Sequence, residues 1–294
     1  MTMRPAAARE DLAQKTGERV ARAYGMTQLP IDPFAIAAAE QIEISALPAG
    51  EGGVSGVFLM SGLQAAILYR ASPRHPGFER FSVAHELGHY FIEGHPEMIL
   101  SGGGRHESRA GFRGTRSAVE VEADHFAAAL LMPPPAVQAV LARAPIGLEA
   151  VRRLKAEAIV SMTAAAIACA RHAAHPMAII VSRGQAVDYA FLSPGFRRLG
   201  RLIFPRKGDP LPAGATASFN LDAAKVRKAA TATGHCRIGD WFDIDRDIDL
   251  DEEIIGLGRS GRTLTVLSSE DLPAEDLFGS EPPGSDQPWS PRFR

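Results

Sequence analysis

The sequence contains little cysteine. Its 294 residues include two, Cys169 and Cys236, and they do not form a CxxC pair. Two cysteines are too few for a disulfide framework, so a reducing compartment is the simpler interpretation. We therefore expect a cytoplasmic protein, with both thiols either in the core or neutral at the surface.

A strong charge of one sign is also missing, as is any long apolar run. The formal net charge is -2, which argues against indiscriminate binding to polyanions. Charged residues interrupt the N-terminal segment between Arg4 and Asp11, and no apolar stretch elsewhere reaches the length of a membrane span. The remaining composition, 46% hydrophobic and 22% charged, is ordinary for a soluble globular protein that is large enough for two compact domains.

One segment, residues 81–91, combines an apolar period with three polar side chains. Apolar residues recur every three or four positions, which predicts a helix. His85 and His89 are four residues apart, so both imidazoles leave the same face about one turn from each other. Two such nitrogens can bind one divalent metal, and Glu86 beside them can take a proton from a water molecule. This is the HExxH arrangement of zinc metallopeptidases.

The alternative is a chance pattern on a solvated helix. That alternative is disfavoured because this helix is apolar, and polar groups on an apolar helix need partners.

A third metal ligand is expected about thirty residues further on, in the segment 117–133. Its apolar period predicts a second amphipathic helix that stops at the prolines after Met132. Glu120 and Asp124 share one face of that helix, so Glu120 would be the ligand and Asp124 would accept a hydrogen bond from a ligand histidine. Glu122 is rotated about 200° from Glu120, which favours a solvated helix charge.

The segments FSVAHELGHYF and EVEADHFAAALLMP together resemble the ImmA/IrrE family of metallopeptidases, within the broader gluzincins. The Leu-Leu-Met-Pro ending is distinctive for that family, and the similarity extends from about Ser55 to about Leu264. The resemblance implies a soluble endopeptidase, dependent on zinc or manganese, whose usual targets are helix-turn-helix repressors. It assigns His85, His89 and Glu120 as metal ligands and Glu86 as the general base. The N-terminal repressor-like domain of some relatives is not evident.

We therefore expect one divalent metal ion, zinc in preference to manganese, although two histidines and one glutamate accept either. The expected partner is a protein substrate, an Xre-like repressor in stress or mobile-element regulation. Neither direct DNA binding nor a membrane is expected. Two other functions stay open: a catalytically silent regulator that keeps the metallopeptidase fold, and a DNA-binding activator.

The expected fold class is α+β, in four parts. A metallopeptidase domain with a small antiparallel sheet covers 1–145, and a helix-turn-helix-like segment covers 146–174. A smaller, GAF-like α/β domain covers 175–268, and a disordered tail covers 269–294. In the helical segment, basic residues would allow DNA contact, but the second helix, 162–171, is nearly all Ala, Ile, Met and Cys. Such side chains cannot read base edges, so a packing role is favoured.

Strands are predicted in both halves of the chain. A strand at 42–47 and a hairpin at 54–60 and 63–69 precede the HExxH helix, and later strands cover 177–181, 186–191, 240–244, 248–257 and 263–267. Between residues 95 and 117 the sequence is rich in Gly, Arg and Ser, which predicts a mobile loop beside the site. Arg105, His106 and Arg109 in this loop could stabilise a developing oxyanion, or they could be ordinary solvated side chains.

Overall fold

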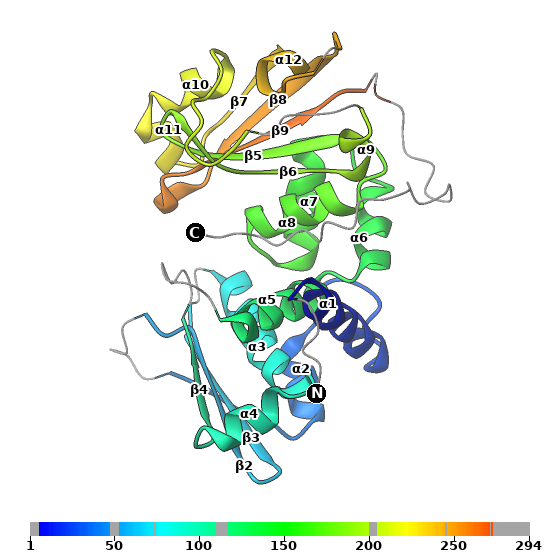
Figure 1. Cartoon of the computed structure of the whole chain (residues 1–294), viewed down its shortest axis with the longest axis vertical. Helices are drawn as coiled ribbons and strands as arrows, with labels where there is room; N and C mark the ends of the chain where they lie inside the picture. The colour runs from blue at the N-terminus through cyan, green and yellow to red at the C-terminus, as the bar shows by residue number, and fades with distance from the viewer. Residues whose placement is uncertain are drawn as a thin grey trace. The chain divides into compact units, whose positions relative to one another are not determined.

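The structure is a computed structural model that describes residues 6–47, 53–72, 75–109, 117–199, 205–244, 246–270 and 272. It divides into two compact units (Figure 1). Of the described residues, the first unit takes those up to Ala136 together with 156–161, and the second takes 137–155 and those from Met162 onward. Most of the predicted disordered tail, 273–294, lies outside the described residues.

The first unit is built on two helices that carry the polar segments singled out above. Its helices are α1 (Ala6–Ala23), α2 (Pro33–Ala39), α3 (Pro76–Phe91), α4 (His95–Ser101) and α5 (Ala118–Leu131), and α6 (Pro134–Leu141) follows. Pro76 occupies the first turn of α3, where a missing N–H costs nothing. The Ser117 hydroxyl caps α5 by accepting the Glu120 N–H. Both predicted site helices are therefore confirmed.

A glycine lets α3 and α5 approach closely. A Cβ at Gly88 would lie 3.1 Å from the Ala123 Cα, which is tighter than ordinary packing. The absence of a side chain at this position brings the HExxH face of α3 against the Glu120 face of α5.

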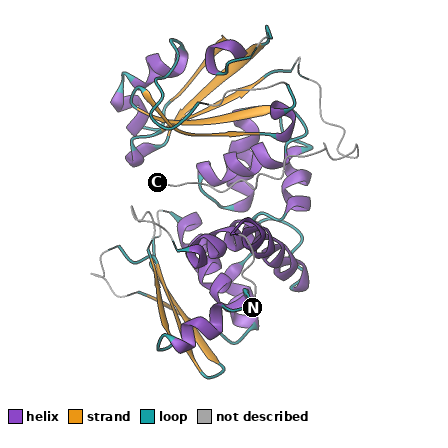
Figure 2. Ribbon diagram, viewed as in Figure 1, coloured by secondary structure: helices purple, strands orange, loops and turns teal. Residues whose placement is uncertain are grey.

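Beside these helices lies a sheet with the strand order β1–β3–β2–β4 (Figure 2). The strands are β1 (Glu43–Ala46), β2 (Gly56–Ser61), β3 (Gln64–Tyr69) and β4 (Arg105–Ser108). The β2–β3 hairpin is confirmed, but β1 pairs with β3 in parallel, so the sheet is mixed and not antiparallel as predicted. The prediction of a loop throughout 95–117 is wrong, because α4 and β4 lie within it. Residues 110–116 are outside the described part.

The second unit is a twisted antiparallel sheet with helices on both faces. Its elements are α7 (Leu148–Ala158) as far as Lys155, α8 (Met162–His172), β5 (Met177–Arg183), β6 (Ala186–Leu192), α9 (Pro194–Arg197), α10 (Ala215–Asn220), α11 (Ala223–Arg227), β7 (Thr231–Arg237), α12 (Ile238–Trp241), β8 (Asp249–Gly256) and β9 (Thr263–Ser268). The strand order is β6–β5–β9–β8–β7. In Figure 1, α10 and α12 lie on one face of this sheet and α8 lies on the other.

The helices predicted at 148–157 and 162–171 correspond to α7 and α8. Most of the small residues of α8 are buried: Ala165, Ala166, Ala168, Cys169 and Ala170. This burial supports the packing role that its composition suggests.

The strand predicted at 240–244 is wrong. Here the Asp240 carboxylate accepts the Arg237 N–H at 2.8 Å, and the chain makes the short helix α12 instead. Strand β7 is not predicted from the sequence because its residues, Thr231 to Arg237, include few large apolar side chains. The likeness of this unit to a GAF domain stays a prediction. In the described part of the chain, no helix has the length and apolar character of a membrane span.

Candidate metal centre

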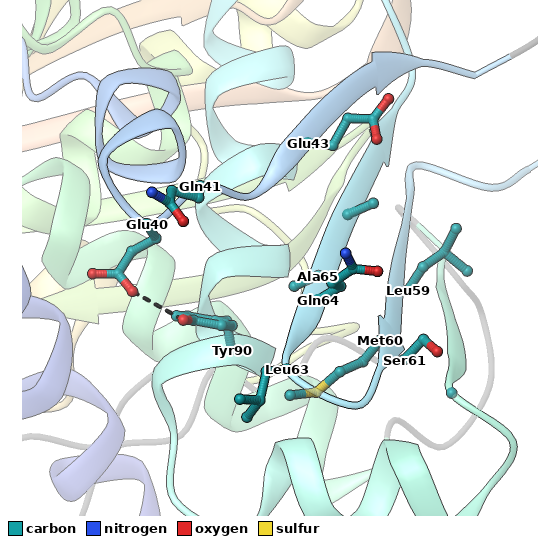
Figure 3. A pocket seen from close by; sticks show the side chains of 12 residues that line it. Glu40, Gln41, Glu43, Leu59, Met60, Ser61, Leu63, Gln64, Ala65 and Tyr90 are labelled. Atoms are coloured by element: carbon teal, nitrogen blue, oxygen red, sulfur yellow. Dashed lines mark hydrogen bonds between the residues drawn. The ribbon is translucent and has the colours of Figure 1, made fainter.

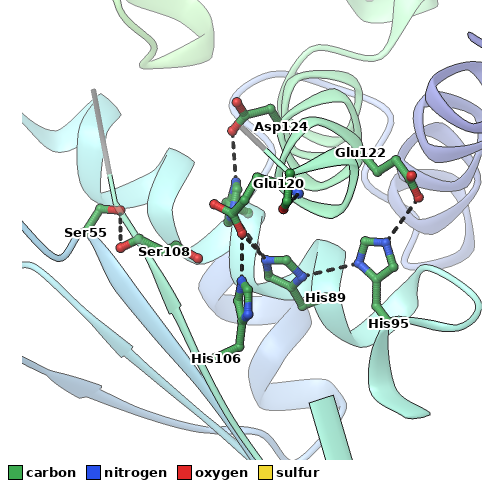
Figure 4. A network of polar contacts seen from close by, with 10 residues as sticks. Ser55, His89, His95, His106, Ser108, Glu120, Glu122 and Asp124 are labelled. Carbon is green, nitrogen blue, oxygen red and sulfur yellow. Dashed lines mark hydrogen bonds and ion pairs between the residues drawn. The ribbon is translucent and has the colours of Figure 1, made fainter. Parts of the chain in front are cut away.

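The side chains of His85, His89 and Glu120 converge on one point, and Figure 4 shows His89 directed toward Glu120. The two Nε2 atoms lie 3.3 Å apart. The Glu120 oxygens lie 3.6 Å from His85 Nε2 and 3.4 Å from His89 Nε2. These atoms can hold one ion, because one ligand atom from each of the three residues lies within 4.8 Å of the others. Two imidazole nitrogens and one carboxylate are a donor set that suits zinc or manganese.

Asp124 lies one turn after Glu120 and holds the first histidine. Its Oδ1 lies 2.9 Å from His85 Nδ1. A ring whose Nδ1–H donates to a carboxylate has its Nε2 lone pair free for a metal. Asp124 therefore lies where it could accept a hydrogen bond from His85 Nδ1 and orient that ring.

The electrostatics of these three residues reflect their burial and their contacts. Burial lowers the pKa of His85, but hydrogen bonds with Asp124 and Glu120 outweigh it and hold that pKa well above the ordinary value. Burial lowers the pKa of His89 to about 3, so this ring is neutral and able to bind a cation. Burial raises the pKa of Glu120, yet hydrogen bonds from His106, His85 and His89 outweigh it and place the pKa far below the ordinary range.

Glu86 is enclosed beside this ligand set. It is 0% exposed, and no described group meets hydrogen-bond geometry with either of its carboxylate oxygens, although the Ser108 hydroxyl lies near enough to lower its pKa. A Cβ at Gly56 on β2 would lie 2.2 Å from Glu86 Oε1, so the carboxylate occupies the space that this glycine leaves. A buried carboxylate without a partner needs a polar group to satisfy it. A water molecule held at the ligand set would do so.

Burial also changes the acidity of Glu86. It raises the pKa from 4.5 to about 7, although the charge of His85 and the nearby Ser108 hydroxyl oppose the shift. The carboxyl group therefore titrates near neutral pH, where a general base works best.

This shift predicts a pH dependence of the stability of the metal-free protein. The folded state keeps the Glu86 proton up to about pH 7 and the unfolded state loses it near 4.5. This group therefore stabilises the fold below pH 4.5, and the contribution is lost as the pH rises through 7. The free energy of unfolding is expected to fall by about 3 kcal/mol across this pH range. Urea unfolding of chelator-treated protein at about pH 5 and pH 8 measures it. Glu86→Gln, which has no titrating group, should lack this part of the dependence, and identical pH profiles for the two proteins would contradict it.

His106, on the edge strand β4, reaches the ligand set as well. Its Nε2 lies 2.7 Å from Glu120 Oε1, and its ring centroid lies 4.3 Å from that of His89. By contrast, Arg105 and Arg109 contact Glu107 at exposed positions. Of the three loop residues considered from the sequence, His106 is thus the one that the described contacts place at the metal centre.

The prediction that Glu122 is a solvated charge is wrong. Its side chain is 4% exposed and its Oε1 lies 2.8 Å from the Arg9 Nε of α1. Its Oε2 lies 3.2 Å from the Nε2 of buried His95. The spacing along the helix predicts that Glu122 points away from His85, His89 and Glu120. It does not predict which residues of other segments cover the Glu122 side chain. The sequence gives no signal for Arg9, which lies more than a hundred positions away.

A hollow of about 600 Å³ lies elsewhere on the first unit, at the hairpin end of the sheet (Figure 3). Glu40, Glu43, Leu59, Met60 and Leu63 contribute to its lining. The Tyr90 hydroxyl donates to Glu40 at 2.9 Å. The lining includes none of the three ligand residues, so this hollow is a separate feature of the described surface.

Comparison with known proteins agrees with the geometry. The profile of the M78 peptidases, described as an IrrE N-terminal-like domain, matches residues 37–169. No protein with a curated description matches the chain in sequence. Among the solved structures that resemble it is a Mycobacterium tuberculosis transcriptional regulator, with a TM-score of 0.53 and 13% identity over 87% of each chain. That likeness shows a shared fold. Residues 37–169, which hold the HExxH helix and the third carboxylate, therefore belong to the IrrE N-terminal-like family of M78 peptidases.

Proposed function

We propose that the first unit is a metallo-endopeptidase that cuts a protein target, a helix-turn-helix transcriptional repressor. The observation that carries the proposal is the buried, unpartnered carboxylate of Glu86 beside His85, His89 and Glu120. A fold that only kept a metal for structure would have no use for such a group. A structural site would also close its coordination with a fourth protein ligand.

Each residue has a distinct task in this reaction. His85, His89 and Glu120 would hold the ion, which when bound supplies Lewis acidity and makes water a better nucleophile. Glu86 takes the proton of the attacking water and passes it to the leaving amine. His106 Nε2, 2.7 Å from Glu120 Oε1, would orient that carboxylate toward the ion.

The position of β4 favours an extended peptide as substrate. Strand β4 is the last in the order β1–β3–β2–β4, so within the described sheet one of its edges is not paired with another strand. A peptide that added to this edge would gain backbone hydrogen bonds. It would also pass His106, which connects the strand to the ligand set.

Gly56 gives a test of the space around the base. Gly56→Ala puts a methyl group where the Glu86 carboxylate lies, and the flexible carboxylate can move away more easily than the fold can change. We expect hydrolysis to fall by at least about tenfold, because the base leaves the geometry that proton transfer requires. Zinc content and thermal stability should change little. Gly239→Ala, in α12, where an added methyl group meets nothing within 4 Å, controls for a glycine substitution remote from the base, and full activity of Gly56→Ala would contradict the assignment.

A regulator without hydrolytic activity is the second candidate, since a protein of similar fold is called a transcriptional regulator. The intact Glu86 distinguishes the two. The test is to co-produce the protein with a helix-turn-helix repressor encoded beside it and to determine the masses of the fragments. A repressor that is cut by the unaltered protein and stays whole with Glu86→Gln supports the peptidase. A repressor that stays whole but binds both proteins supports the regulator.

A further inference from the structure

The two ligand histidines are held in different ways. His85 Nδ1 contacts a carboxylate directly, the Asp124 Oδ1 at 2.9 Å. His89 Nδ1 instead contacts another imidazole, the His95 Nδ1 at 3.2 Å. An imidazole can accept this hydrogen bond only if its own proton lies on the other nitrogen. The orientation of His89 therefore depends on what fixes the proton of His95.

The described contacts permit one arrangement of protons along this path. A nitrogen that binds a metal carries no proton, so His89 has its proton on Nδ1 and donates to His95 Nδ1. The proton of His95 is then on Nε2, which lies 3.2 Å from Glu122 Oε2, an acceptor. Glu122 Oε2 also accepts a hydrogen bond from Arg9 Nη2 at 3.1 Å, and Glu122 Oε1 forms an ion pair with Arg9 Nε at 2.8 Å. Each donor of the path meets an acceptor (Figure 4 shows the part from His89 to Glu122).

The hydrogen bonds from His89 through His95 to Glu122 lie in the interior of the first unit. His89, His95 and Glu122 are 0%, 1% and 3% exposed, so water does not compete for their hydrogen bonds. A buried carboxylate is costly without a counter-charge, and Arg9 supplies one from outside the matched residues 37–169.

Helix α1 is held firmly enough to place that charge. A Cβ at Gly17 would lie 2.4 Å from the Phe126 carbonyl oxygen. The backbones of α1 and α5 therefore approach closely at this point, which fixes the position of Arg9 over Glu122.

We propose that Arg9, Glu122 and His95 form a positioning chain that fixes the tautomer and ring orientation of His89, and that α1 is therefore part of the metal centre. The proposal rests on the metal site of the proposed function but not on peptide hydrolysis. Partners that hold a ligand histidine typically change metal affinity about 10- to 100-fold when they are replaced. Replacing Arg9 is thus expected to change metal affinity through Glu122, His95 and His89.

A second charged pair across the same interface provides the control. Glu10 Oε2 lies 3.7 Å from His125 Nε2, an ion pair between α1 and α5 that includes neither His95 nor Glu122. Arg9→Met removes the guanidinium and keeps most of the apolar stem, whereas Glu10→Gln weakens the neighbouring pair. If α1 acts only by packing, both substitutions should have the same small effect on zinc binding.

The experiment is zinc affinity of the full-length chain, measured by competition with a chromophoric chelator. We expect about a tenfold loss for Arg9→Met, about 10- to 100-fold for His95→Leu, and no change for Glu10→Gln. An Arg9→Met protein that binds zinc as tightly as Glu10→Gln would overturn the positioning chain.

A second measurement needs no variant that might misfold. Nitrogen-labelled histidine NMR of the zinc-loaded, unaltered chain reports which ring nitrogens carry protons. We expect His89 protonated at Nδ1 and His95 at Nε2 alone. A proton on His95 Nδ1 would overturn the proposal while leaving the metal site intact. A chain that binds no zinc at His85 and His89 would overturn the metal site itself, which separates the two failures.

Discussion

Replacing Glu86 with glutamine is expected to lower peptide hydrolysis by about 10²- to 10⁴-fold. Glutamine keeps the size of the side chain and its place against Gly56, but it cannot take a proton from water. The ligand residues His85, His89 and Glu120 are unchanged, so the zinc content should stay the same. The measurement is the initial rate of substrate cleavage, with the zinc content of each preparation determined by plasma emission.

Glu93→Gln is the matched control, because Glu93 is an exposed carboxylate just beyond the end of α3. It should cleave at the rate of the unaltered protein. A Glu86→Gln protein that also cleaves at that rate would show that another group accepts the proton, and the assigned role of Glu86 would be wrong.

Glu120→Gln is expected to reduce zinc affinity by more than about 100-fold, a larger loss than for partners that only position a ligand. Glu120 supplies the carboxylate of the ligand set, and a neutral amide is a much weaker donor. Glu122→Gln should cause a smaller loss, because Glu122 acts through His95 and an amide oxygen can still accept from His95 Nε2. The zinc affinities of the two variants, measured by competition with a chelator, show which substitution causes the larger loss.

The ranking separates a ligand from a positioning residue two positions away on α5. Equal affinities for Glu120→Gln and the unaltered protein would contradict the ligand set. A greater loss for Glu122→Gln than for Glu120→Gln would exchange the two assignments.

The sequence predicts those parts of the metal centre that depend on local order. His85, Glu86 and His89 lie on one helix, and Glu120 and Asp124 lie on another, so helical spacing alone brings each set to one face. The long apolar periods of α3 and α5 make both helices easy to predict. The two helices pack closely at Gly88. Such packing is expected if residues on both helices bind the same ion.

The residues that spacing does not predict depend on contacts between distant segments. Glu122 is buried because α1 covers it, and the Arg9 that neutralises it lies 113 positions away. His106 reaches Glu120 only because β4 pairs with β2, and a short polar edge strand has no periodic signal. At Asp240 the side chain accepts a local hydrogen bond from the Arg237 N–H, and a short helix forms where a strand was predicted.

The central claim, that the first unit hydrolyses a peptide bond of a protein target, is tested most directly by hydrolysis in water enriched in heavy oxygen. Purified, zinc-loaded protein is incubated with the candidate repressor, and the fragments are analysed by mass spectrometry. We predict one new C-terminus that carries the heavy oxygen, produced by the unaltered protein and removed by Glu86→Gln. A repressor that stays intact, or fragments that form equally with Glu86→Gln, would contradict the account.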